Sequence, residues 1–325
     1  TDYDIEGEVI GWNVVRFLCN QKDANRMKFS TLTKPDLLES YEHKSKTIDW
    51  GQAKAGETRH FLDWMYGINI SRALTLAIRK AKVYETLSSG RVQGPTLKIL
   101  TDREKEISVF EPKKYWQLQL INSVEAWHEN DKFWEESEAD KILEKTKGKD
   151  GIVKTIEKSE KKQPPPYPFD LTTLQTEAYR CFGMNPKNTL SLAQELYSNG
   201  YISYPRTSSQ QLSPKLGFQK ILTQLQKQTK YKDLATKLLS KKTLTPNNGG
   251  KTDPAHPAIY PTGILPEKIT QYSAKIYDLI TKRFLATFGE WASRETNQIK
   301  INVEKEIFIA KGTRTTVEGW HIYYT

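Results

Sequence analysis

Apolar residues at helical spacing fill the first third of the chain. Residues 8–19 (EVIGWNVVRFLC) are apolar enough to predict a largely buried helix, and residues 26–32 predict a short strand after it. Residues 57–81 carry two successive apolar sets, and residues 92–107 repeat the helical pattern, so each predicts a helix. This part of the chain is therefore expected to be mainly helical.

The period changes at Tyr115, where apolar and polar residues begin to alternate. The segment WQLQLI has the period of two that is typical of a half-exposed strand, so a β-rich region is expected to begin here. Residues 158–170 (KSEKKQPPPYPFD) are charged and then proline-rich. Such a composition predicts a stiff, extended connection and makes this stretch the best hinge candidate.

Helical patterns dominate from this connection to about Gly289. The clearest helices cover residues 189–199, closed by Gly200, and residues 269–288, whereas residues 296–324 alternate again as strands. Strand segments therefore flank a helical insertion. Its two connections to the sheet are expected to lie near each other and to let the insertion swing as a unit.

The composition favours a nucleic-acid partner and no membrane span. The 325 residues include 49 Lys and Arg against 39 Asp and Glu, a net charge of +10 that suits a polyanion. Eight Trp and sixteen Tyr offer stacking surfaces for unpaired bases. No apolar run approaches the roughly 18 residues of a membrane span, and no signal peptide opens the chain. We expect a cytoplasmic, nucleoid-associated protein.

The two cysteines and the first residue each support one further expectation. Cys19 and Cys181 lie far apart and outside any metal-binding spacing, which predicts reduced core residues and no zinc site. Thr1 is followed at once by an acidic motif, so we expect the sequence to be a fragment.

That acidic motif, TDYDIEGE, is the first candidate site. Asp2, Asp4 and Glu6 alternate just before a helix, and carboxylates on a strand-to-helix turn can converge on a hard divalent cation such as Mg²⁺. The alternative is a solvated turn whose acidic residues favour the helix N-terminus. Spacing alone supports the two interpretations about equally.

A tyrosine segment, YISYPRTSS, follows a helix that Asn188 or Thr189 is expected to cap. Pro205 favours an extended conformation at Tyr204, so Tyr204 and Arg206 are expected to project to the same side. A phenol with a pKa of about 10 is a weak nucleophile, and a guanidinium helps by favouring the phenolate and binding phosphate. The alternative, a packed sheet tyrosine beside a surface arginine, is favoured without further evidence.

The segment LSSGRVQ carries side chains suited to DNA. Gly90 lets the backbone come close to a partner, Arg91 can grip a phosphate, and Gln93 can bond a base or sugar. The alternative is a loop at a helix start that Ser88 or Ser89 caps, and it is favoured when the segment is considered alone.

The segment DPAHPAIYPTG holds His256 among prolines. A histidine on such a rigid loop is a candidate for acid–base chemistry or phosphate contact, although a lone histidine is usually structural. Just before it, residues 249–252 (GGKT) resemble the end of a nucleotide-binding P-loop. Thr245 stands where the first glycine belongs and no strand precedes, so we predict no ATP site here.

In this order, the four segments resemble the type IA DNA topoisomerases. TDYDIEGEVIGW is similar to the second acidic motif of the TOPRIM domain, and RHFLDWMYG with LSSGRVQGPTLKILTDREKEI is similar to the DNA-binding helical segment. SLAQELYSNGYISYPRTSSQ is similar to the catalytic tyrosine region, and DPAHPAIYPTG to the histidine loop. The resemblance covers nearly the whole chain and looks most like the archaeal topoisomerase I/III branch. The alternatives are the topoisomerase module of a reverse gyrase, a TOPRIM-type nuclease or primase, and a non-enzymatic single-strand-binding remnant.

The resemblance implies an ATP-independent reaction in which Tyr204 becomes 5′-phosphotyrosyl, Arg206 steadies the scissile phosphate and His256 lies near the active site. It implies Mg²⁺ held by Asp2, Asp4 and Glu6. The implied DNA-binding residues are Ser88, Ser89, Gly90, Arg91, Val92, Gln93, Arg59 and Asp63. The expected substrate is single-stranded regions of negatively supercoiled DNA, or linked DNA to be resolved, and the expected assembly is a monomer.

The implied fold class is α+β and multidomain, an incomplete type IA toroid. The expected parts are a C-terminal piece of the TOPRIM α/β domain (1–34), a helical DNA-binding domain (35–110), a β-rich arch (111–170 and 291–325) and an inserted helical catalytic-tyrosine domain (171–290). Its hinges are expected at 158–170 and 289–296. Ser208 departs from the family, because many relatives carry aspartate there. The family's assisting TOPRIM glutamate and lysine, and its Gly-Arg-Pro-Ser-Thr-type motif, are expected to lie outside this sequence.

Overall fold

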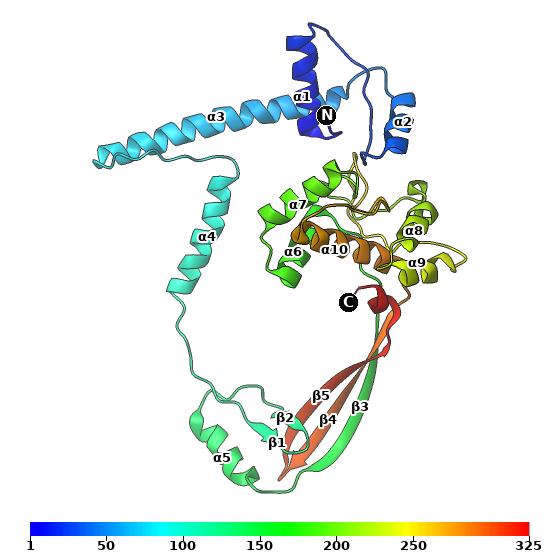
Figure 1. Ribbon diagram of the computed structural model, residues 1–325. Coiled ribbons are helices and arrows are strands. Elements are labelled where there is room, and N and C mark those ends of the chain that lie inside the picture. The colour runs from blue at the N-terminus through cyan, green and yellow to red at the C-terminus, as the bar shows by residue number, and fades with distance from the viewer. Residues whose placement is uncertain (325) are drawn as a thin grey trace. The chain divides into compact units, whose positions relative to one another are not determined.

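A computed structural model describes residues 1–324 and divides the chain into two compact units (Figure 1). The N-terminal unit comprises residues 1–30 and 34–112, and the C-terminal unit comprises residues 31–33 and the chain from residue 113 onward. In the described part of the chain, no helix combines the length and the apolar character needed to cross a membrane.

The N-terminal unit is built from helices. They are α1 (Ile5–Asn13), a π-helical turn (Val14–Leu18), α2 (Lys34–Glu42), α3 (Trp50–Lys80) and α4 (Gln93–Ser108). Helix α1 packs closely on α3, because a Cβ atom added at Gly56 would lie 2.3 Å from Val9 Cγ2. Glycine at position 56 therefore permits the helix contact that forms this unit's small core.

A buried carboxylate fastens three segments of the N-terminal unit together. Glu8 is 2% exposed, and its Oε2 accepts a hydrogen bond from Arg26 Nε at 2.6 Å. Its Oε1 accepts from the backbone N–H of Asp49 at 2.7 Å, at the start of α3. The Arg26 guanidinium also donates to the carbonyl oxygens of Thr1 and Asp2. Burying this ion pair is tolerable because each charged group has several hydrogen-bond partners.

Two predictions for the start of the chain are wrong. The helix expected at 8–19 begins earlier, because Asp4 caps it, and its C-terminal part is exposed, with Phe17 at 71% and Leu18 at 80%. The strand expected at 26–32 is reduced to one isolated bridge between Arg26 and Ser45, because no second strand lies beside it. Within residues 1–112, all of which the structure describes, no longer strand forms.

The two longer helical predictions are confirmed. The helix expected at 57–81 is α3, which starts seven residues earlier because the Asp49 side chain accepts from the N–H of Gln52 at 3.1 Å. The helix expected at 92–107 is α4, displaced by one residue.

The C-terminal unit contains an antiparallel sheet with the order β1-β2-β5-β4-β3. The strands are β1 (Gln119–Ile121), β2 (Glu125–His128), β3 (Ile152–Gln163), β4 (Ala292–Val303) and β5 (Glu306–Val317), with α5 (Glu136–Thr146) between β2 and β3. In Figure 1, β3, β4 and β5 form one long ribbon. A small core of Ala126, Ile301 and Phe308 lies at one end of it.

The ribbon confirms that both connections to the helical insertion lie together, because Gln163 at the end of β3 pairs with Ala292 at the start of β4. The extended linker is shorter than predicted. Residues 158–163 belong to β3, and the remaining extended stretch is the proline-rich 164–168. The strand pattern at 296–324 is correct only to Val317. A 3₁₀ helix (Gly319–Tyr323) follows, entered through a left-handed Gly319 (φ +52°).

The helical body between β3 and β4 carries the larger core. Its helices are α6 (Leu171–Phe182), α7 (Pro186–Ser198), a 3₁₀ turn (Pro214–Leu216), α8 (Phe218–Gln226), α9 (Lys232–Leu239) and α10 (Gln271–Thr287). Each of the five α-helices contributes a buried side chain to one shared core. These side chains are Leu174, Leu196, Leu222, Leu238 and Phe284. Helix α10 confirms the helix predicted at residues 269–288.

Helix α7 shows where local prediction was imprecise. Its cap is Asn185, whose Oδ1 accepts from the N–H of Asn188 at 2.8 Å, so the expected cap at Asn188 or Thr189 is wrong. Pro186 suits the first helical position because its missing N–H would have no partner there. Gly200 closes the helix in a left-handed conformation (φ +76°), as predicted.

Both cysteines are free and exposed, so the predicted core positions are wrong. Cys19 follows the exposed π-helical turn. Cys181 continues the spacing of buried Leu174 and Ala178 but lies in the last turn of α6, where its side chain is exposed.

Candidate functional site

The tyrosine segment (residues 201–211) and the histidine loop (residues 249–262) lie against each other in the helical body. Ile202 and Pro261 form an antiparallel bridge. The N–H of Ser203 donates to the carbonyl of Tyr260 at 2.9 Å, and further along the N–H of Ala258 donates to the carbonyl of Gln211 at 2.9 Å. Two stretches that sequence analysis found separately are therefore joined along their length.

Tyr204 and His256 meet inside this pairing. Tyr204 is 2% exposed and His256 is 4% exposed. Their ring centroids lie 4.4 Å apart with planes tilted by 40°, and Tyr197 of α7 packs edge-on against Tyr204 at 5.2 Å. The structure thus brings together the predicted nucleophile and the predicted histidine, and packs Tyr204 into the larger core.

Arg206 does not share the side that Tyr204 occupies, so that expectation is wrong. Tyr204 points into the core whereas Arg206 is exposed. Pro205 lies in a bend between them, which interrupts the period of two on which the expectation depended. Arg206 therefore faces solvent, where it can meet a phosphate that arrives from outside.

Asp253 is a site residue that sequence reasoning missed. Its Oδ1 accepts from the N–H groups of Ala255 at 2.9 Å and His256 at 3.1 Å. Its Oδ2 accepts from the N–H of Ser208 at 3.2 Å and from Ser208 Oγ at 3.0 Å. Partial burial opposes ionisation, but the hydrogen bonds from Ala255, Ser208 and His256 outweigh it and lower the pKa of Asp253. The sequence did offer a signal for Asp253, because an aspartate side chain commonly accepts a hydrogen bond from the backbone N–H two residues later, here that of Ala255.

A second carboxylate, Asp170, supports the same region. It is 2% exposed, caps α6 by accepting from the N–H of Thr173 at 2.7 Å, and also accepts from Gln210 Nε2 at 3.2 Å. Lys251 Nζ lies 3.1 Å from its Oδ2. Burial opposes ionisation, but the bonds from Thr173 and Lys251 lower the pKa of Asp170. The lysine of the P-loop-like stretch is thus used within the fold.

Two hydroxyl side chains of α3 form hydrogen bonds with the backbone of the segment LSSGRVQ. The N–H of Ser89 donates to Ser71 Oγ at 2.9 Å, and the N–H of Leu87 donates to Thr75 Oγ1 at 3.1 Å. Both hydroxyls donate back to the carbonyls of the same residues at 3.2 Å. Hydroxyls four residues apart on the helix were the signal for this contact.

Arg91 and two residues of α3 meet on the surface. Arg91 Nε donates to Asp63 Oδ1 at 2.5 Å, and Arg59 Nε lies 3.7 Å from Asp63 Oδ2. The Arg91 hydrogen bond is the main cause that lowers the pKa of Asp63. The predicted Arg59, Asp63 and Arg91 are therefore brought together.

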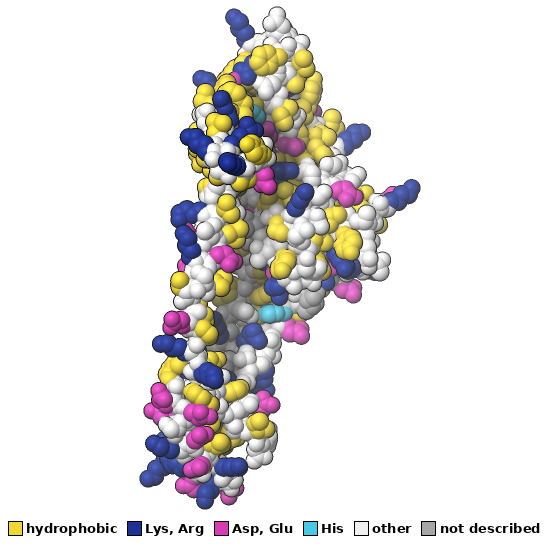
Figure 2. Space-filling view, turned by 90° about the vertical axis from the view of Figure 1, so that its left-hand side faces the viewer, with side chains coloured by type: hydrophobic (Ala, Val, Ile, Leu, Met, Phe, Trp, Pro, Cys, Tyr) yellow, Lys and Arg dark blue, Asp and Glu magenta, His cyan; other side chains and the backbone are white. Residues whose placement is uncertain are grey.

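The remaining residues of this segment lie at the start of α4. Val92 occupies the N-cap position without a side-chain hydrogen bond, so the alternative cap at Ser88 or Ser89 is wrong. Ser88, Val92 and Gln93 are exposed, and Ser89 and Gly90 are half-buried. Exposed Phe61, Trp64 and Tyr66 of α3 lie in the same unit, and Figure 2 shows hydrophobic and basic side chains interspersed on the face that it views.

The acidic motif does not form a three-carboxylate metal group. Asp4 Oδ1 accepts from the N–H of Gly7 at 2.7 Å and caps α1, while both carboxylate oxygens of Glu6 lie 3.1 Å from His60 Nε2. Across residues 1–324, no cluster of three or more His, Cys, Asp or Glu side chains suits a metal ion. The use of Asp4 agrees with the alternative in which acidic residues favour the helix start.

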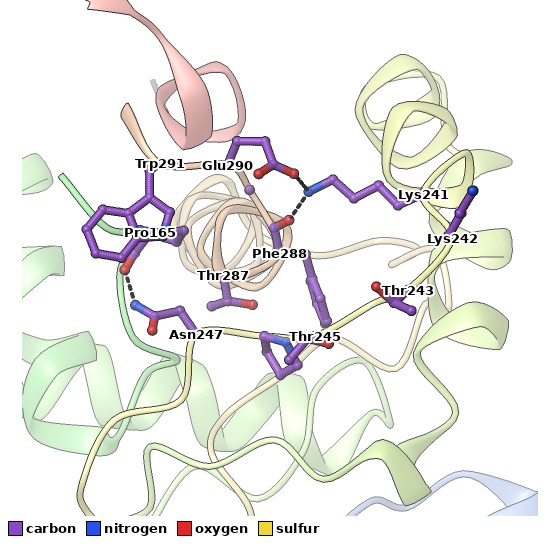
Figure 3. Close-up of a pocket in the computed structure, with 12 residues that line it drawn as sticks. Pro165, Lys241, Lys242, Thr243, Thr245, Asn247, Thr287, Phe288, Glu290 and Trp291 are labelled. Atoms are coloured by element: carbon purple, nitrogen blue, oxygen red, sulfur yellow. Dashed lines mark hydrogen bonds and ion pairs between the residues drawn. The ribbon is translucent and has the colours of Figure 1, made fainter. Parts of the chain in front are cut away.

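A pocket of about 530 Å³ lies elsewhere in the C-terminal unit, between the proline-rich linker, the loop after α9 and the end of α10 (Figure 3). Lys241 Nζ donates to the carbonyl of Phe288 at 2.6 Å and to the Glu290 carboxylate, and Trp291 borders the opening. None of the predicted site residues lines this pocket. It is therefore separate from the tyrosine–histidine site.

Comparisons with known proteins agree on one family. A family model described as DNA topoisomerase matches residues 47–325. DNA topoisomerase 1 of Pyrococcus horikoshii is 47% identical over 99% of this chain and 48% of its own length. DNA topoisomerase 1 of Methanocaldococcus jannaschii is 46% identical over 100% of this chain and 43% of its own.

A solved structure gives the same answer for the fold. Full-length topoisomerase I from Thermotoga maritima is similar over 99% of this chain and 54% of its own, with a TM-score of 0.78 and 28% identity. The chain thus spans about half the length of the relatives it matches. Because nearly the whole chain superimposes, the predicted mixed α and β fold class is confirmed.

Proposed function

The chain belongs to the type IA family of DNA topoisomerases, and from this membership we propose that it cuts one DNA strand through Tyr204, lets DNA pass and reseals the cut. The observation that carries the proposal is the contact of Tyr204 with His256 inside the region that the family model matches. In the proposed reaction the phenolic oxygen attacks phosphorus, a P–O bond to Tyr204 forms, and the 3′ oxygen leaves. The reverse reaction restores the strand, so no ATP is required.

Three side chains divide the work in this proposal. Tyr204 is the nucleophile, and the imidazole of His256 beside it is available for its proton or for a phosphate oxygen. Exposed Arg206 steadies the scissile phosphate from the solvent side. Because Tyr204 is only 2% exposed, the surrounding side chains must open before the phenol can reach a phosphate.

The proposed substrate is single-stranded regions of negatively supercoiled or linked DNA. Arg59 and Arg91 offer charge for the backbone, and exposed Phe61, Trp64 and Tyr66 offer stacking surfaces for unpaired bases. We extend the proposal to a monomer that acts in the cytoplasm at the nucleoid. The division into four domains also remains a prediction.

Mg²⁺ at Asp2, Asp4 and Glu6 is a finer part of the proposal. When bound, such an ion would offset charge on phosphate oxygens. The three carboxylates as they lie do not fit a three-ligand site, because Asp4 caps α1 and Glu6 meets His60. No step of the proposed reaction is therefore assigned to the metal.

The test is a covalent adduct in the full-length protein that carries this chain. A single-stranded oligonucleotide labelled at its 3′ end should migrate with the protein after SDS treatment, whereas a 5′ label should not. Tyr204→Phe should abolish the adduct and leave single-strand binding intact, because only a hydroxyl is lost. The matched control is Tyr201→Phe, whose hydroxyl meets the backbone of Glu267 instead.

An adduct that persists in Tyr204→Phe would contradict the assignment of the nucleophile. The same gel separates the nuclease alternative, because a nuclease cuts the strand without leaving protein attached to it.

A further inference from the structure

One carboxylate joins the two segments that carry the proposed chemistry. Asp253 accepts hydrogen bonds on one oxygen from the histidine loop and on the other from the tyrosine segment. We propose that Asp253 is a positioning residue, which holds the loop in the register that puts His256 beside Tyr204. The inference rests on the proposed function, since the role it assigns is to support Tyr204 chemistry.

The loop side of the contact fixes the backbone at His256 itself. Asp253 Oδ1 accepts from the N–H of Ala255 at 2.9 Å and from the N–H of His256 at 3.1 Å. These two bonds close a tight turn around Pro254. Because the His256 main chain is held, its ring enters the core along a fixed direction.

The segment side of the contact fixes the chain four residues after Tyr204. Asp253 Oδ2 accepts from both the N–H and the Oγ of Ser208, at 3.2 and 3.0 Å. Thr207 Oγ1 adds a longer bond of 3.4 Å to the carbonyl of His256. A residue needed only for its own turn would use one oxygen; the second oxygen of Asp253 spans 45 positions of sequence.

The fold does not depend on this carboxylate for holding the segments together. Elsewhere the backbone joins them, through Ser203 and Tyr260 and through Ala258 and Gln211. Asp253 controls the part of the loop between Lys251 and Ala258, which includes His256. Its loss should therefore loosen the approach of the two rings while the helical body stays folded.

Asp253→Asn separates the two halves of this contact. The amide oxygen can still accept from Ala255 and His256, so the turn and the side-chain volume remain. The amide nitrogen then faces the N–H of Ser208, where two donors meet and no bond forms, so of the two bonds to Ser208 only one to its hydroxyl, which can also accept, can remain. Ser208→Ala is the milder companion, because it removes the hydroxyl and leaves the N–H donor. Asp233→Asn, at the start of α9, is the matched control for charge.

The experiment measures single-turnover cleavage and single-strand affinity separately in the full-length protein. Asp253→Asn should slow cleavage about 10- to 100-fold, the scale expected when a catalytic group is misplaced by about 1 Å. DNA affinity should stay near wild type, and the melting temperature should fall only slightly, because backbone hydrogen bonds elsewhere still join the two segments. Ser208→Ala should slow cleavage less, and Asp233→Asn should not slow it. Amide exchange at Ser208 and His256 should accelerate in Asp253→Asn.

Wild-type cleavage in Asp253→Asn would overturn the inference. An equal loss of cleavage, affinity and melting temperature would also overturn it, because it would show a general structural role. If the wild-type protein forms no adduct, or Tyr204→Phe still forms one, the proposed function itself fails. Amide exchange then still reports whether Asp253 joins the two segments.

Discussion

The two regions that carry the proposed chemistry differ in how they are built. Tyr204 and His256 are 2% and 4% exposed, inside the helical body that carries the larger core. Arg91 and Asp63 form their pair on the surface, with side chains 43% and 39% exposed. The proposed reacting groups are thus fixed by packing, whereas Arg91 and Asp63 are held mainly by their ion pair.

This difference fits the role proposed for each region. A nucleophile benefits from a fixed geometry that exists before the substrate arrives, and a close-packed core supplies it. A surface that binds a flexible strand benefits from charges that stay hydrated until they meet phosphate, and such charges are screened by salt. Changes in the first region should therefore alter stability and rate, and changes in the second should alter binding.

The acidic residues of the two units differ in the same way, in how far hydrogen bonds within the fold hold them. Asp170 and Asp253 in the C-terminal unit each accept several hydrogen bonds, and their pKa values are lowered. In the N-terminal unit, Asp4 accepts from the N–H of Gly7 at a helix start and Glu6 meets His60 on an exposed surface. Asp170 and Asp253 are therefore occupied by hydrogen bonds within the fold. For Asp4 and Glu6, a metal ion could compete with the partners that they have now.

The largest expected effect is on Asp170. Asp170→Asn leaves the α6 cap but places an amide N–H₂ group beside the donors of Gln210 and Lys251. Hydrogen bonds to buried charged groups contribute about 2 kcal/mol, so the free energy of unfolding at pH 7 should fall by about that amount. Urea unfolding followed by near-UV circular dichroism measures it, with Asp233→Asn as the control.

The sign of the pH dependence sharpens this test. The folded-state pKa of Asp170 is lowered, so its contribution is full above the ordinary aspartate pKa of about 4 and is lost as pH falls through the lowered value. The difference in the free energy of unfolding between wild type and Asp170→Asn should therefore be constant near neutral pH. It should shrink toward zero in acid. A difference that widens below pH 4 would contradict the assignment.

An intermediate effect is expected at the acidic motif. Asp2→Asn combined with Asp4→Asn removes two charges, while the amide oxygen introduced at position 4 can still cap α1. If Mg²⁺ binds here, a Mg²⁺ concentration of about ten times the dissociation constant should stabilise the wild-type unit by about 1.4 kcal/mol and the double variant by much less. The measurement is the melting temperature with and without Mg²⁺.

The control for this prediction is Glu104→Gln combined with Glu106→Gln on α4, which removes the same charge from an exposed helix. An identical Mg²⁺ shift in the acidic-motif variant and in wild type would show that these carboxylates serve only the helix start.

Local patterns predicted the elements well where one physical cause dominates. The helices α3, α4 and α10, most of β4 and β5, and the left-handed Gly200 follow from periodicity or backbone sterics. Predictions failed where a distant partner decides the outcome. Residues 158–163 are mostly charged and exposed, yet they form a strand because β4 lies beside them. Residues 26–32 look like a strand and lack such a partner.

The predictions for the site also depended on whether a local pattern or a distant partner decides the outcome. The motifs predicted roles for Tyr204, His256 and Arg91 from residue type and local spacing, and the structure brings Tyr204 and His256 together, but the roles themselves stay predictions. The Asp253–Ser208 bridge was not predicted, since it joins positions 45 apart and spacing does not encode the register between loops. The position of Arg206 was wrong because a single bend at Pro205 reversed the expected side.

The smallest effect on stability, and the clearest effect on binding, is expected at Arg91. Arg91→Ala removes one half of an exposed pair, so the melting temperature should not change. If Arg91 meets a phosphate, the slope of log affinity against log salt should fall by roughly one contact, about 0.7 for a single strand. Fluorescence anisotropy with a short oligonucleotide at several salt concentrations measures the slope, and Arg103→Ala on α4 is the matched loss of charge.

The pair with Asp63 makes this prediction sharper. Arg91 donates to Asp63 before DNA arrives, so a phosphate must displace that carboxylate or share the guanidinium with it. Asp63→Asn weakens the competitor and should raise single-strand affinity, most strongly at low salt where charge is least screened. Lower affinity in Asp63→Asn would show instead that Asp63 orders Arg91 for binding. An unchanged slope in Arg91→Ala would remove this residue from the DNA surface and leave binding to Arg59 and the exposed aromatics of α3.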